Sequence, residues 1–577
     1  MNIRLILVSC LLLASICWAA DPTKFTITNT RDAGPGSLRD ALTRCARTGG
    51  HAIIAFNIPK SDPHFDADTG TWTLTYQDTP PPLTVSDVTI DGFTQAANQR
   101  DTNPHGPAIV LSGDHHSVEY AFVLINSSHV TITGFGIKEF LYGIEIFGPG
   151  SHDNRITGNY VGVNSDATAA AGNYNGIELV SGAHDNTIGG VTPAERNIVS
   201  GNQHVGIRIS DAHRNTIIGN YVGVDRTGTN AVPNYDGICA EGRSRGNLIG
   251  GAKPGERNIA SGNVAYGVDL FGWGVQDNII RGNYIGTDVT GTKAIPNTYG
   301  LLFDDRSSRN IVGGLGDGEG NLISGNTAFG AYFYNNGTCS NVVCGNRIGT
   351  DLTGTKAIPN ETGVHIDGGT FGNLVDKNLI SGNLIAGVTI FALYTDHNTI
   401  TRNLIGTDLT GNKPLGNGAD GVRIAFGPKS NLVGGAPATA NVIAHNGKSG
   451  VAIESPVDTR NRISCNAIYQ NRNTGIELSR LGMTVPVITA VHVTATNCTI
   501  TGNITSPNPA TITIEIFGDD LKSTRHAQGK IYFGTTHPTS NGQWLFETAS
   551  LKLAQVITAT ATDDQGNTSA FAQGVKF

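Results

Sequence analysis

Short apolar stretches separated by Gly and Asn recur through the middle of this chain. Between about residues 142 and 480, a Gly-apolar-x-apolar stretch is followed by two further short apolar stretches, and the unit returns after roughly 30 residues. Two copies read GIELVSGAHDNTIGGVTPAERNIVSGN and GLLFDDRSSRNIVGGLGDGEGNLISGN. Three short strands per turn, with Gly and Asn at the corners, predict the coils of a parallel β-helix. In each first stretch, the x residue and the residue after the second apolar position point outward.

The segments on either side of the array have different patterns. Residues 21–141 begin with the strand FTITNT, and GPGSLRDALTRCARTGG then predicts an amphipathic helix that Ser37 caps and Gly49-Gly50 ends. Such a helix would cover the open end of the stack. Residues 486–577 alternate apolar and polar positions between turn residues, which predicts an Ig-like antiparallel β-sandwich of about seven strands. The predicted fold is all-β: an N-terminal cap with the first rungs at 21–141, a β-helix at 142–485, and a C-terminal β-sandwich.

The composition and the first twenty residues limit which partners and which cellular location we expect. The chain has 577 residues, 15% of them charged, and a net charge of −8 without any Lys/Arg run, which argues against nucleic acid or an anionic membrane surface as partner. Residues 1–20 are predicted to be a secretion signal, with Arg4 before a long apolar run and Ala19-Ala20 at its end. No later stretch is apolar enough to span a bilayer. We therefore expect an exported protein that is secreted, periplasmic or held at the cell surface.

The array, with FTITNTRDAGPGSLRDAL near the start and VITATATDDQGNTSAF near the end, resembles secreted bacterial right-handed parallel β-helix repeat proteins of the pectate-lyase-like superfamily. This resemblance covers nearly the whole chain after the signal and implies right-handed coils. The group includes pectate lyases, polygalacturonases and surface proteins, so it implies a polysaccharide partner without fixing a reaction. Polygalacturonase-like enzymes combine an Asn-x-Asp with an Asp-Asp, a Gly-His-Gly and an Arg-x-Lys. Only Asp304-Asp305 matches that set, so the catalytic roles of the family are not carried over.

The outward positions of the first stretch gather acids and aromatic rings most densely between Glu241 and Phe391. Glycan cleavage needs one carboxyl group as an acid and another as a base or nucleophile, and aromatic rings stack on sugar faces. The predicted catalytic residues are Asp269, Asp304, Asp305 and Asp367. The predicted substrate-binding residues are Glu241, Phe271, Trp273, Arg306, Tyr332, Tyr334, His365 and Phe391.

The repeat also bounds the distances between these acids. Asp304 and Asp367 take the same outward position on alternate rungs, so they should stand about 9–10 Å apart, at the upper end of the separation in inverting glycosidases. Asp269, one rung from Asp304 at the other outward position, is predicted to be closer. Hydrolysis of a polysaccharide is the leading hypothesis, although the acidic stripe disfavours a polyuronate unless calcium or Arg208, Arg306 and Arg423 compensate.

Other interpretations remain open. A lyase or epimerase would use Tyr334 or His365 as base and an arginine as neutraliser. A non-catalytic surface or adhesive protein would use the rod as a spacer. In the blandest interpretation, the polar and aromatic residues simply form the solvated face of a sheet.

Two repeated features allow a metal as an alternative to a structural role. His152, His184 and His213 precede the corner Asn of successive units, and the sequence favours a solvated turn ladder over a metal site. The Gly-Thr-Asp-x-Thr-Gly loops place Asp288, Asp351 and Asp408, with Asp225 in a variant, where the side chain can bond its own backbone. Structural calcium is the alternative at these loops, and no other cofactor is predicted.

Overall fold

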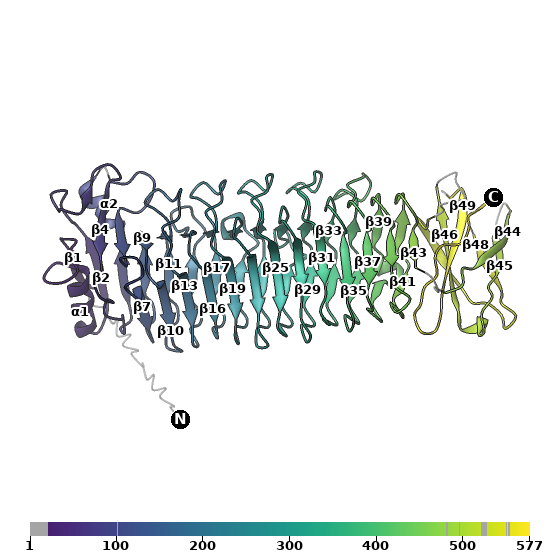
Figure 1. Ribbon diagram of the computed structural model, residues 1–577, viewed down its shortest axis with the longest axis horizontal. Coiled ribbons are helices and arrows are strands. Elements are labelled where there is room, and N and C mark those ends of the chain that lie inside the picture. The colour runs from purple at the N-terminus through teal and green to yellow at the C-terminus, as the bar shows by residue number, and fades with distance from the viewer. Residues whose placement is uncertain are drawn as a thin grey trace, which may run out of the picture.

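The computed structural model describes residues 21–100, 102–479, 483–494, 497–520, 528–549, 551 and 554–577. The predicted secretion signal, residues 1–20, lies outside the described residues. The molecule is a long rod, with helix α1 at the N-terminal end and a group of antiparallel strands at the other (Figure 1).

Three long parallel sheets form the rod, and each full coil gives one strand to every sheet. Sheet A contains β1 (Thr23–Ile27), β2 (Ala52–Phe56), β5 (Val88–Asp91), β8 (Thr131–Thr133), β11 (Arg155–Thr157), β14 (Thr187–Gly189), β17 (Thr216–Ile218), β20 (Leu248–Gly250), β23 (Ile279–Arg281), β26 (Ile311–Gly313), β29 (Val342–Cys344), β32 (Leu374–Asp376), β35 (Thr399–Thr401), β38 (Leu432–Gly434) and β41 (Arg462–Ser464).

Sheet B follows sheet A in each coil. It contains β3 (Phe65–Asp66), β4 (Thr71–Thr75), β6 (Ile109–Ser112), β9 (Phe135–Lys138), β12 (Tyr160–Val161), β15 (Ile198–Val199), β18 (Tyr221–Val222), β21 (Ile259–Ala260), β24 (Tyr284–Ile285), β27 (Leu322–Ile323), β30 (Arg347–Ile348), β33 (Leu379–Ile380), β36 (Leu404–Ile405), β39 (Val442–Ala444) and β42 (Ala467–Tyr469).

Sheet C is built from the Gly-apolar-x-apolar stretches. It contains β7 (Tyr120–Ile125), β10 (Tyr142–Phe147), β13 (Asn175–Val180), β16 (Val205–Ser210), β19 (Asp236–Glu241), β22 (Tyr266–Phe271), β25 (Tyr299–Asp304), β28 (Phe329–Phe333), β31 (Thr362–Ile366), β34 (Val388–Phe391), β37 (Val422–Ala425), β40 (Val451–Ile453) and β43 (Ile476–Leu478). The prediction of a parallel β-helix is confirmed.

The N-terminal end of the rod is closed by a helix. In α1 (Leu38–Thr48), Leu38, Ala41, Leu42 and Cys45 are buried on one face. Ser37 caps the helix through its hydroxyl, which accepts the N–H of Asp40 at 3.2 Å, and Gly49 ends it with a left-handed φ of 81°. The predicted cap is therefore confirmed. A second helix, α2 (Thr94–Gln99), was not predicted.

The interior of the rod is one continuous apolar column in which inward Ile, Val and Leu of all three sheets stack. At each corner between sheets, a buried asparagine bonds to the asparagine of the next coil. Asn310 shows the pattern: its Oδ1 accepts the backbone N–H and the side-chain N–H of Asn278, and its Nδ2 donates to Val275 O and Asn341 Oδ1. Coils are thus tied together by side chains as well as by strand pairing.

These asparagine ladders run along all three corners. Between sheets C and A the ladder is Asn154, 186, 215, 247, 278, 310, 341, 373, 398, 431 and 461. Between A and B it is Asn159, 197, 220, 258, 283, 321, 346, 378, 403, 441 and 466. Between B and C it is Asn173, 202, 234, 263, 297, 326, 360, 383, 417, 446 and 471.

The long loops after alternate sheet B strands fold back over the outside of sheet B. Val224, Val232 and Ile295 from these loops pack with Tyr221 and Tyr284 of the sheet in a second apolar cluster. The loops that contain Asp225, Asp288, Asp351 and Asp408 are each fixed by this aspartate, as predicted. The carboxylate of Asp288 accepts the Thr290 hydroxyl and the N–H groups of Thr292 and Lys293, and Asp225, Asp351 and Asp408 make the same turn.

The C-terminal region is a pair of antiparallel sheets. One contains β44 (Val487–Val493), β45 (Cys498–Asn503) and β48 (Gln543–Thr548), and the other β46 (Thr513–Asp519), β47 (Ile531–Thr536), β49 (Val556–Thr562) and β50 (Val575–Lys576). This region packs against the end of the rod, where its side chains take the hydrogen bonds that a further coil would make. Gln528 Oε1 accepts the backbone and side-chain N–H groups of Asn471, and Glu515 accepts the N–H of Cys465. The β-helix is therefore capped at both ends, and neither end of the rod exposes unpaired strands.

The asparagine ladders predict a large cost for removing one member. We expect Asn310→Ala to lower the free energy of unfolding by roughly 2–4 kcal/mol, because it leaves the buried N–H groups of Asn278 and the carbonyl of Val275 without partners. Calorimetric unfolding at a fixed scan rate measures the change. Asn412→Ala, at an exposed loop asparagine, is the control and should shift the midpoint little. Equal shifts for the two variants would contradict the role given to the ladder.

Candidate functional site

The outer face of sheet C carries two columns of outward side chains in the predicted register. The first column holds the x residues: Asp269 pairs with Leu302, Leu302 with Tyr332, and Tyr332 with His365. The second column lies two residues further along each strand, where Phe271 pairs with Asp304. It continues to Tyr334 and Asp367, whose N–H groups donate to the carbonyls of Phe303 and Phe333 at 2.9 Å. One wall of the rod therefore brings together Asp269, Asp304, Asp367, Tyr332, Tyr334 and His365.

The first column points away from the core but is largely shielded from water, which the sequence did not predict. Cys239, Asp269, Leu302 and Thr389 are all buried. The cover comes from aromatic side chains at the strand starts. Tyr299 packs on Tyr332 with ring centroids 5.6 Å apart. These rings exclude water from positions that the alternation alone would leave solvated.

Aromatic rings form an almost continuous band along sheet C. Phe329 lies nearly parallel to His365 with centroids 4.1 Å apart, and Tyr332 contacts Tyr334 at 5.2 Å. Phe391 then contacts Phe426 at 4.7 Å. The whole band consists of Tyr266, Tyr299, Phe329, Tyr332, Tyr334, His365, Phe391 and Phe426. Tyr334 and Phe426 expose 38% and 61% of their surface, so part of the band is open to a ligand. Phe271, one rung before Asp304 and outside the band, is 43% exposed.

Asp304 lies half-buried at the end of β25. Asn335 Nδ2 donates to its Oδ1 at 2.7 Å, and the N–H of Asp305 donates to the same oxygen at 2.5 Å. Burial raises the pKa of Asp304, the nearby Asp305 carboxylate adds to the rise, and the two donors oppose it. The result is a partly accessible carboxyl group that holds its proton to higher pH than an exposed aspartate.

Asp367 follows β31, two rungs from Asp304 in the second column. His365 Nε2 lies 3.6 Å from Asp367 Oδ2, and the N–H of Gly368 donates to Oδ1 at 2.5 Å. His365 Nδ1 is buried and has no hydrogen-bond partner in the described structure. With a rung spacing of ~4.8 Å, Asp304 and Asp367 stand about 9–10 Å apart, and Tyr334 fills the rung between them.

Asp269 is enclosed rather than open to solvent. It is 7% exposed, its Oδ1 has no hydrogen-bond partner among the described groups, and the Cys239 thiol lies 3.8 Å from Oδ2. Burial, with Asp236 and Asp304 nearby, raises its pKa well above the ordinary range. Its diagonal position relative to Asp304 gives a separation of about 8 Å. A buried carboxyl group is poorly placed to reach a polymer, so Asp269 belongs to the wall beneath Asp304.

Two predicted residues lie in the turn beyond the face. Asp305 and Arg306 are exposed and have left-handed φ angles of 43° and 68°. The Arg306 N–H donates to the Thr338 hydroxyl at 3.2 Å. The turn carries both side chains past the end of the strand, so the structure does not bring Asp305 into line with Asp304 and Asp367.

Two other predicted binding residues, Glu241 and Trp273, lie close to arginine side chains. Glu241 forms an ion pair with Arg208, which also contacts Glu178 Oε1 at 3.2 Å. Trp273 is 64% exposed and lies at the corner between sheets C and A, where Arg243 sits 5.6 Å from its ring. Glu241 is thus a structural ion-pair partner, and Trp273 belongs to a different surface.

The prediction did not select Glu145, an unusual acid at the N-terminal end of sheet C. It pairs in register with Glu178 and lines a cavity of about 280 Å³ with Tyr120 and Phe147. Burial, followed by the charge of Glu178, raises the pKa of Glu145 to about 7. The sequence signal was present, since Glu145 and Glu178 take the same x position on consecutive rungs.

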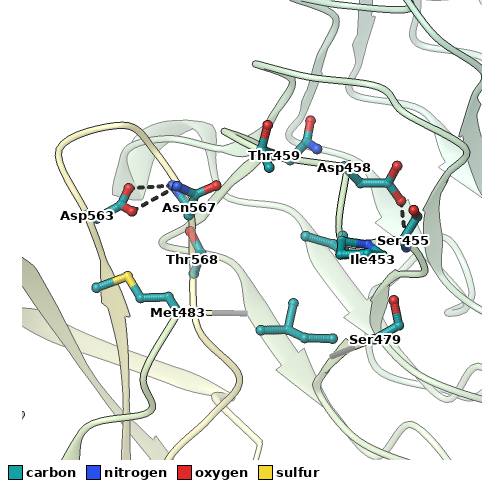
Figure 2. Close-up of a pocket in the computed structure, with 12 residues that line it drawn as sticks. Ile453, Ser455, Asp458, Thr459, Ser479, Met483, Asp563, Asn567 and Thr568 are labelled. Atoms are coloured by element: carbon teal, nitrogen blue, oxygen red, sulfur yellow. Dashed lines mark hydrogen bonds between the residues drawn. The ribbon is translucent and has the colours of Figure 1, made fainter. Parts of the chain in front are cut away.

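A second cavity, of about 230 Å³, lies where the rod meets the C-terminal sheets (Figure 2). Its polar groups are already paired with each other. Asn567 donates to Asp563 at 2.8 Å, and Asp458 accepts the N–H of Ser455 at 2.8 Å. This cavity is best explained as the joint between the two parts.

The remaining histidines and cysteines that the sequence singled out form no further site among the described residues. The rings of His152, His184 and His213 stack at 5.3 and 6.4 Å, which fits the predicted turn ladder. Among the described residues, no group of three or more His, Cys, Asp or Glu is arranged to hold a metal ion. Cys45, Cys239, Cys339, Cys344, Cys465 and Cys498 are free thiols. None of the described helices has the length and apolar character needed to cross a membrane.

The sheets and their outer face define a parallel β-helix repeat protein. No protein-family model and no curated protein sequence matches the chain. Among solved structures, the chain is similar to DFA-IIIase from Arthrobacter chlorophenolicus A6, with 13% identity and a TM-score of 0.29 over 79% of this chain and 92% of that one. A similarity of this size does not bear on the site, whose function has to be argued from this chain's own residues.

The raised pKa of Glu145 predicts a pH dependence of stability. Its folded-state pKa of about 7 exceeds the ordinary 4.5, so its contribution is complete below about pH 4.5 and is lost as the pH rises through 7. Glu145→Gln removes that loss. At pH 8 we expect the variant to be more stable than the wild type by on the order of 3 kcal/mol, with no such gain at pH 4.

Calorimetric unfolding of both proteins across this pH range tests the prediction. Asp317→Asn, at an exposed loop carboxylate, is the control and should follow the wild-type profile. A constant difference between Glu145→Gln and the wild type at all pH values would show that the charge of Glu145 is not the cause.

Proposed function

We propose that the protein binds a polysaccharide along the outer face of sheet C and hydrolyses it with Asp304 and Asp367. The observation that carries this proposal is the pair of carboxyl groups in one column, two rungs apart, with an exposed tyrosine between them and aromatic rings on both sides. Carboxyl pairs at this separation leave room for a water molecule beside the sugar, as inversion of the anomeric centre requires.

In the proposed reaction the two acids take different roles. Burial raises the pKa of Asp304, which supports a protonated general acid at the leaving oxygen. Asp367, two rungs away in the same column with His365 Nε2 3.6 Å from its Oδ2, takes the role of the general base. Hydrolysis with inversion uses one carboxyl group as acid and the other as base.

The aromatic band supplies a platform for the sugar units. Tyr334 lies between the two acids and would support the sugar ring whose bond is cleaved. Phe271 extends the platform on one side, and Phe391 and Phe426 extend it on the other. Rings spaced along one wall suit an extended chain better than a small molecule, which would need an enclosed pocket.

The arginines favour hydrolysis over a lyase reaction on this face. A lyase acting on a uronate needs a cation to neutralise the substrate carboxylate. Arg208 pairs with Glu178 and Glu241, and Arg423 pairs with Glu454 through two hydrogen bonds. Arg306 sits in the turn beyond the column. Two of the three candidate cations are therefore already neutralised by the protein itself.

We also propose that the protein is exported, on the strength of residues 1–20. A polysaccharide too large to enter a cell would be met outside the cytoplasm, so this proposal agrees with the substrate.

The assignment predicts a large loss of hydrolysis in Asp304→Asn. Removing a general acid should lower kcat by roughly 10²–10⁴-fold, and Asp367→Asn should have a similar effect. Reducing-end release from a panel of neutral and acidic polysaccharides measures activity. Proton NMR of the first product on the cleaved glycan should show inversion at the anomeric carbon.

The matched control is Asp305→Asn, one residue from Asp304 but outside the column. It should keep kcat within a few-fold of the wild type. Full activity in Asp304→Asn, or an equal loss in Asp305→Asn, would refute the assignment. Tight binding of a glycan without any product would leave a binding protein in place of an enzyme.

A further inference from the structure

The corner between sheets C and A contains an open cleft of about 900 Å³ that is separate from the Asp304–Asp367 column. It spans the turns that follow β16, β19 and β22. The residues important to its chemistry are Asp211, His213, Arg243, Arg245, Trp273 and Gln276. His213, Arg245 and Gln276 bridge one another on successive coils, so they form the floor of the cleft at one rung spacing.

Trp273 stands at the edge of this cleft with its ring uncovered. It is the most exposed tryptophan among the described residues, since Trp72 and Trp544 are buried. The Arg243 guanidinium lies over the ring, 5.6 Å from its centroid, and the backbone N–H of Arg243 donates to Asp211 Oδ1 at 3.0 Å. An indole ring held beside a guanidinium can stack on a pyranose ring while the cation meets a substituent.

The arginines of this cleft are unpaired, unlike their neighbours on the same side of the rod. One coil earlier, Arg214 pairs with Asp185 at 2.7 Å, and two coils later Arg309 pairs with Asp277 at 2.9 Å. Arg243 and Arg245 form no ion pair with a carboxylate in the described structure. The cleft therefore has two guanidinium groups and one carboxylate, Asp211, in a protein with a net charge of −8.

A glycine interrupts the line of ion pairs beside the cleft. Gly246 takes the position that Arg214 holds one coil earlier and Asp277 one coil later. A Cβ at Gly246 would meet only Arg214 Cγ, at 3.8 Å, so the space is unfilled. The line of ion pairs is therefore interrupted between Asp185–Arg214 and Asp277–Arg309, next to Arg245.

The pKa of His213, on the floor of the cleft, is lowered by burial and by the positive charge of the nearby arginines. Burial lowers the pKa of His213, and Arg245 and Arg214 lower it further, against a smaller opposing effect of Asp185. His213 is therefore neutral near pH 7, and the cationic character comes from the guanidinium groups, which stay charged at all relevant pH values.

We infer that this cleft binds an anionic sugar unit, with the sugar ring stacked on Trp273 and its carboxylate or sulfate held by Arg243 and Arg245. Guanidinium groups bind both kinds of oxyanion through paired N–H donors. Phe271 on the sheet C face is two residues from Trp273, so the cleft adjoins that face. The inference rests on the proposed function for its ligand class: an acidic unit anchors a glycan whose neutral part crosses sheet C.

Binding of three probes to the purified protein tests the inference. They are trigalacturonate, sulfated maltotriose and unmodified maltotriose, which separate a carboxylate from a sulfate and both from a neutral sugar. Titration calorimetry gives Kd, and protection of tryptophan fluorescence from acrylamide reports on Trp273. We expect at least one anionic probe to bind, to protect the fluorescence, and to bind more weakly in 0.5 M NaCl. The neutral trisaccharide should show no protection at the same concentrations.

A double variant, Arg243→Gln/Arg245→Gln, should weaken binding of the anionic probe by roughly tenfold or more, because two charge-assisted contacts are lost. Arg462→Gln, at an exposed arginine of β41, is the matched control and should leave Kd unchanged. Trp273→Phe should abolish the fluorescence response and keep part of the affinity.

Failure of both anionic probes to bind, equal binding of the neutral probe, or an unchanged Kd in the double variant would each overturn the inference. Asp304→Asn separates this result from the proposed reaction. Because Asp304 lies outside the cleft, that variant should bind the anionic probe with wild-type affinity whether or not hydrolysis depends on Asp304.

Discussion

The asparagine ladders are the constraint on which the rest of this structure depends. Each buried Asn satisfies backbone groups of its own corner and bonds the next Asn, so a coil can stack on its neighbour in one register only. A shift of one residue would turn every outward side chain of sheet C toward the core. Because the ladders prevent such shifts, residues about thirty positions apart in sequence stand one rung apart on the wall of the rod.

The three faces of the rod have different surroundings, and this difference locates the chemistry. Sheet B is covered by the long loops, whose apolar side chains pack onto its outer surface. Sheet C has no such cover, but the tyrosine and phenylalanine rings at its strand starts lie across the first column. Acids of the first column are therefore desolvated, while the second column stays accessible. A glycan that approaches sheet C would meet Asp304, Tyr334 and Asp367 before the enclosed Asp269.

The charged side chains also differ between the sheet C face and the neighbouring corner. Arg208 and Arg423 are neutralised within the protein, which keeps the sheet C face acidic or neutral. At the corner beside it, Arg243 and Arg245 form no ion pair with a carboxylate among the described residues, so they are available to a ligand. The two surfaces thus suit different parts of one polymer, a neutral segment at the acids and an acidic unit at the cleft.

The sequence by itself determined the coils, the corners, the helix cap at Ser37 and the wall that Asp304, Tyr334 and Asp367 share, because a strand's two-residue period and the repeat length fix the direction of each Cβ. Only the tertiary structure decided which of these groups water can reach. Tyr299 and Phe329 cover the first column, the turn at Asp305 and Arg306 leaves the line, Arg208 joins Glu241, and Trp273 faces a corner cleft. These outcomes depend on side-chain rotamers and on contacts between neighbouring coils, and a one-dimensional pattern contains no information about either.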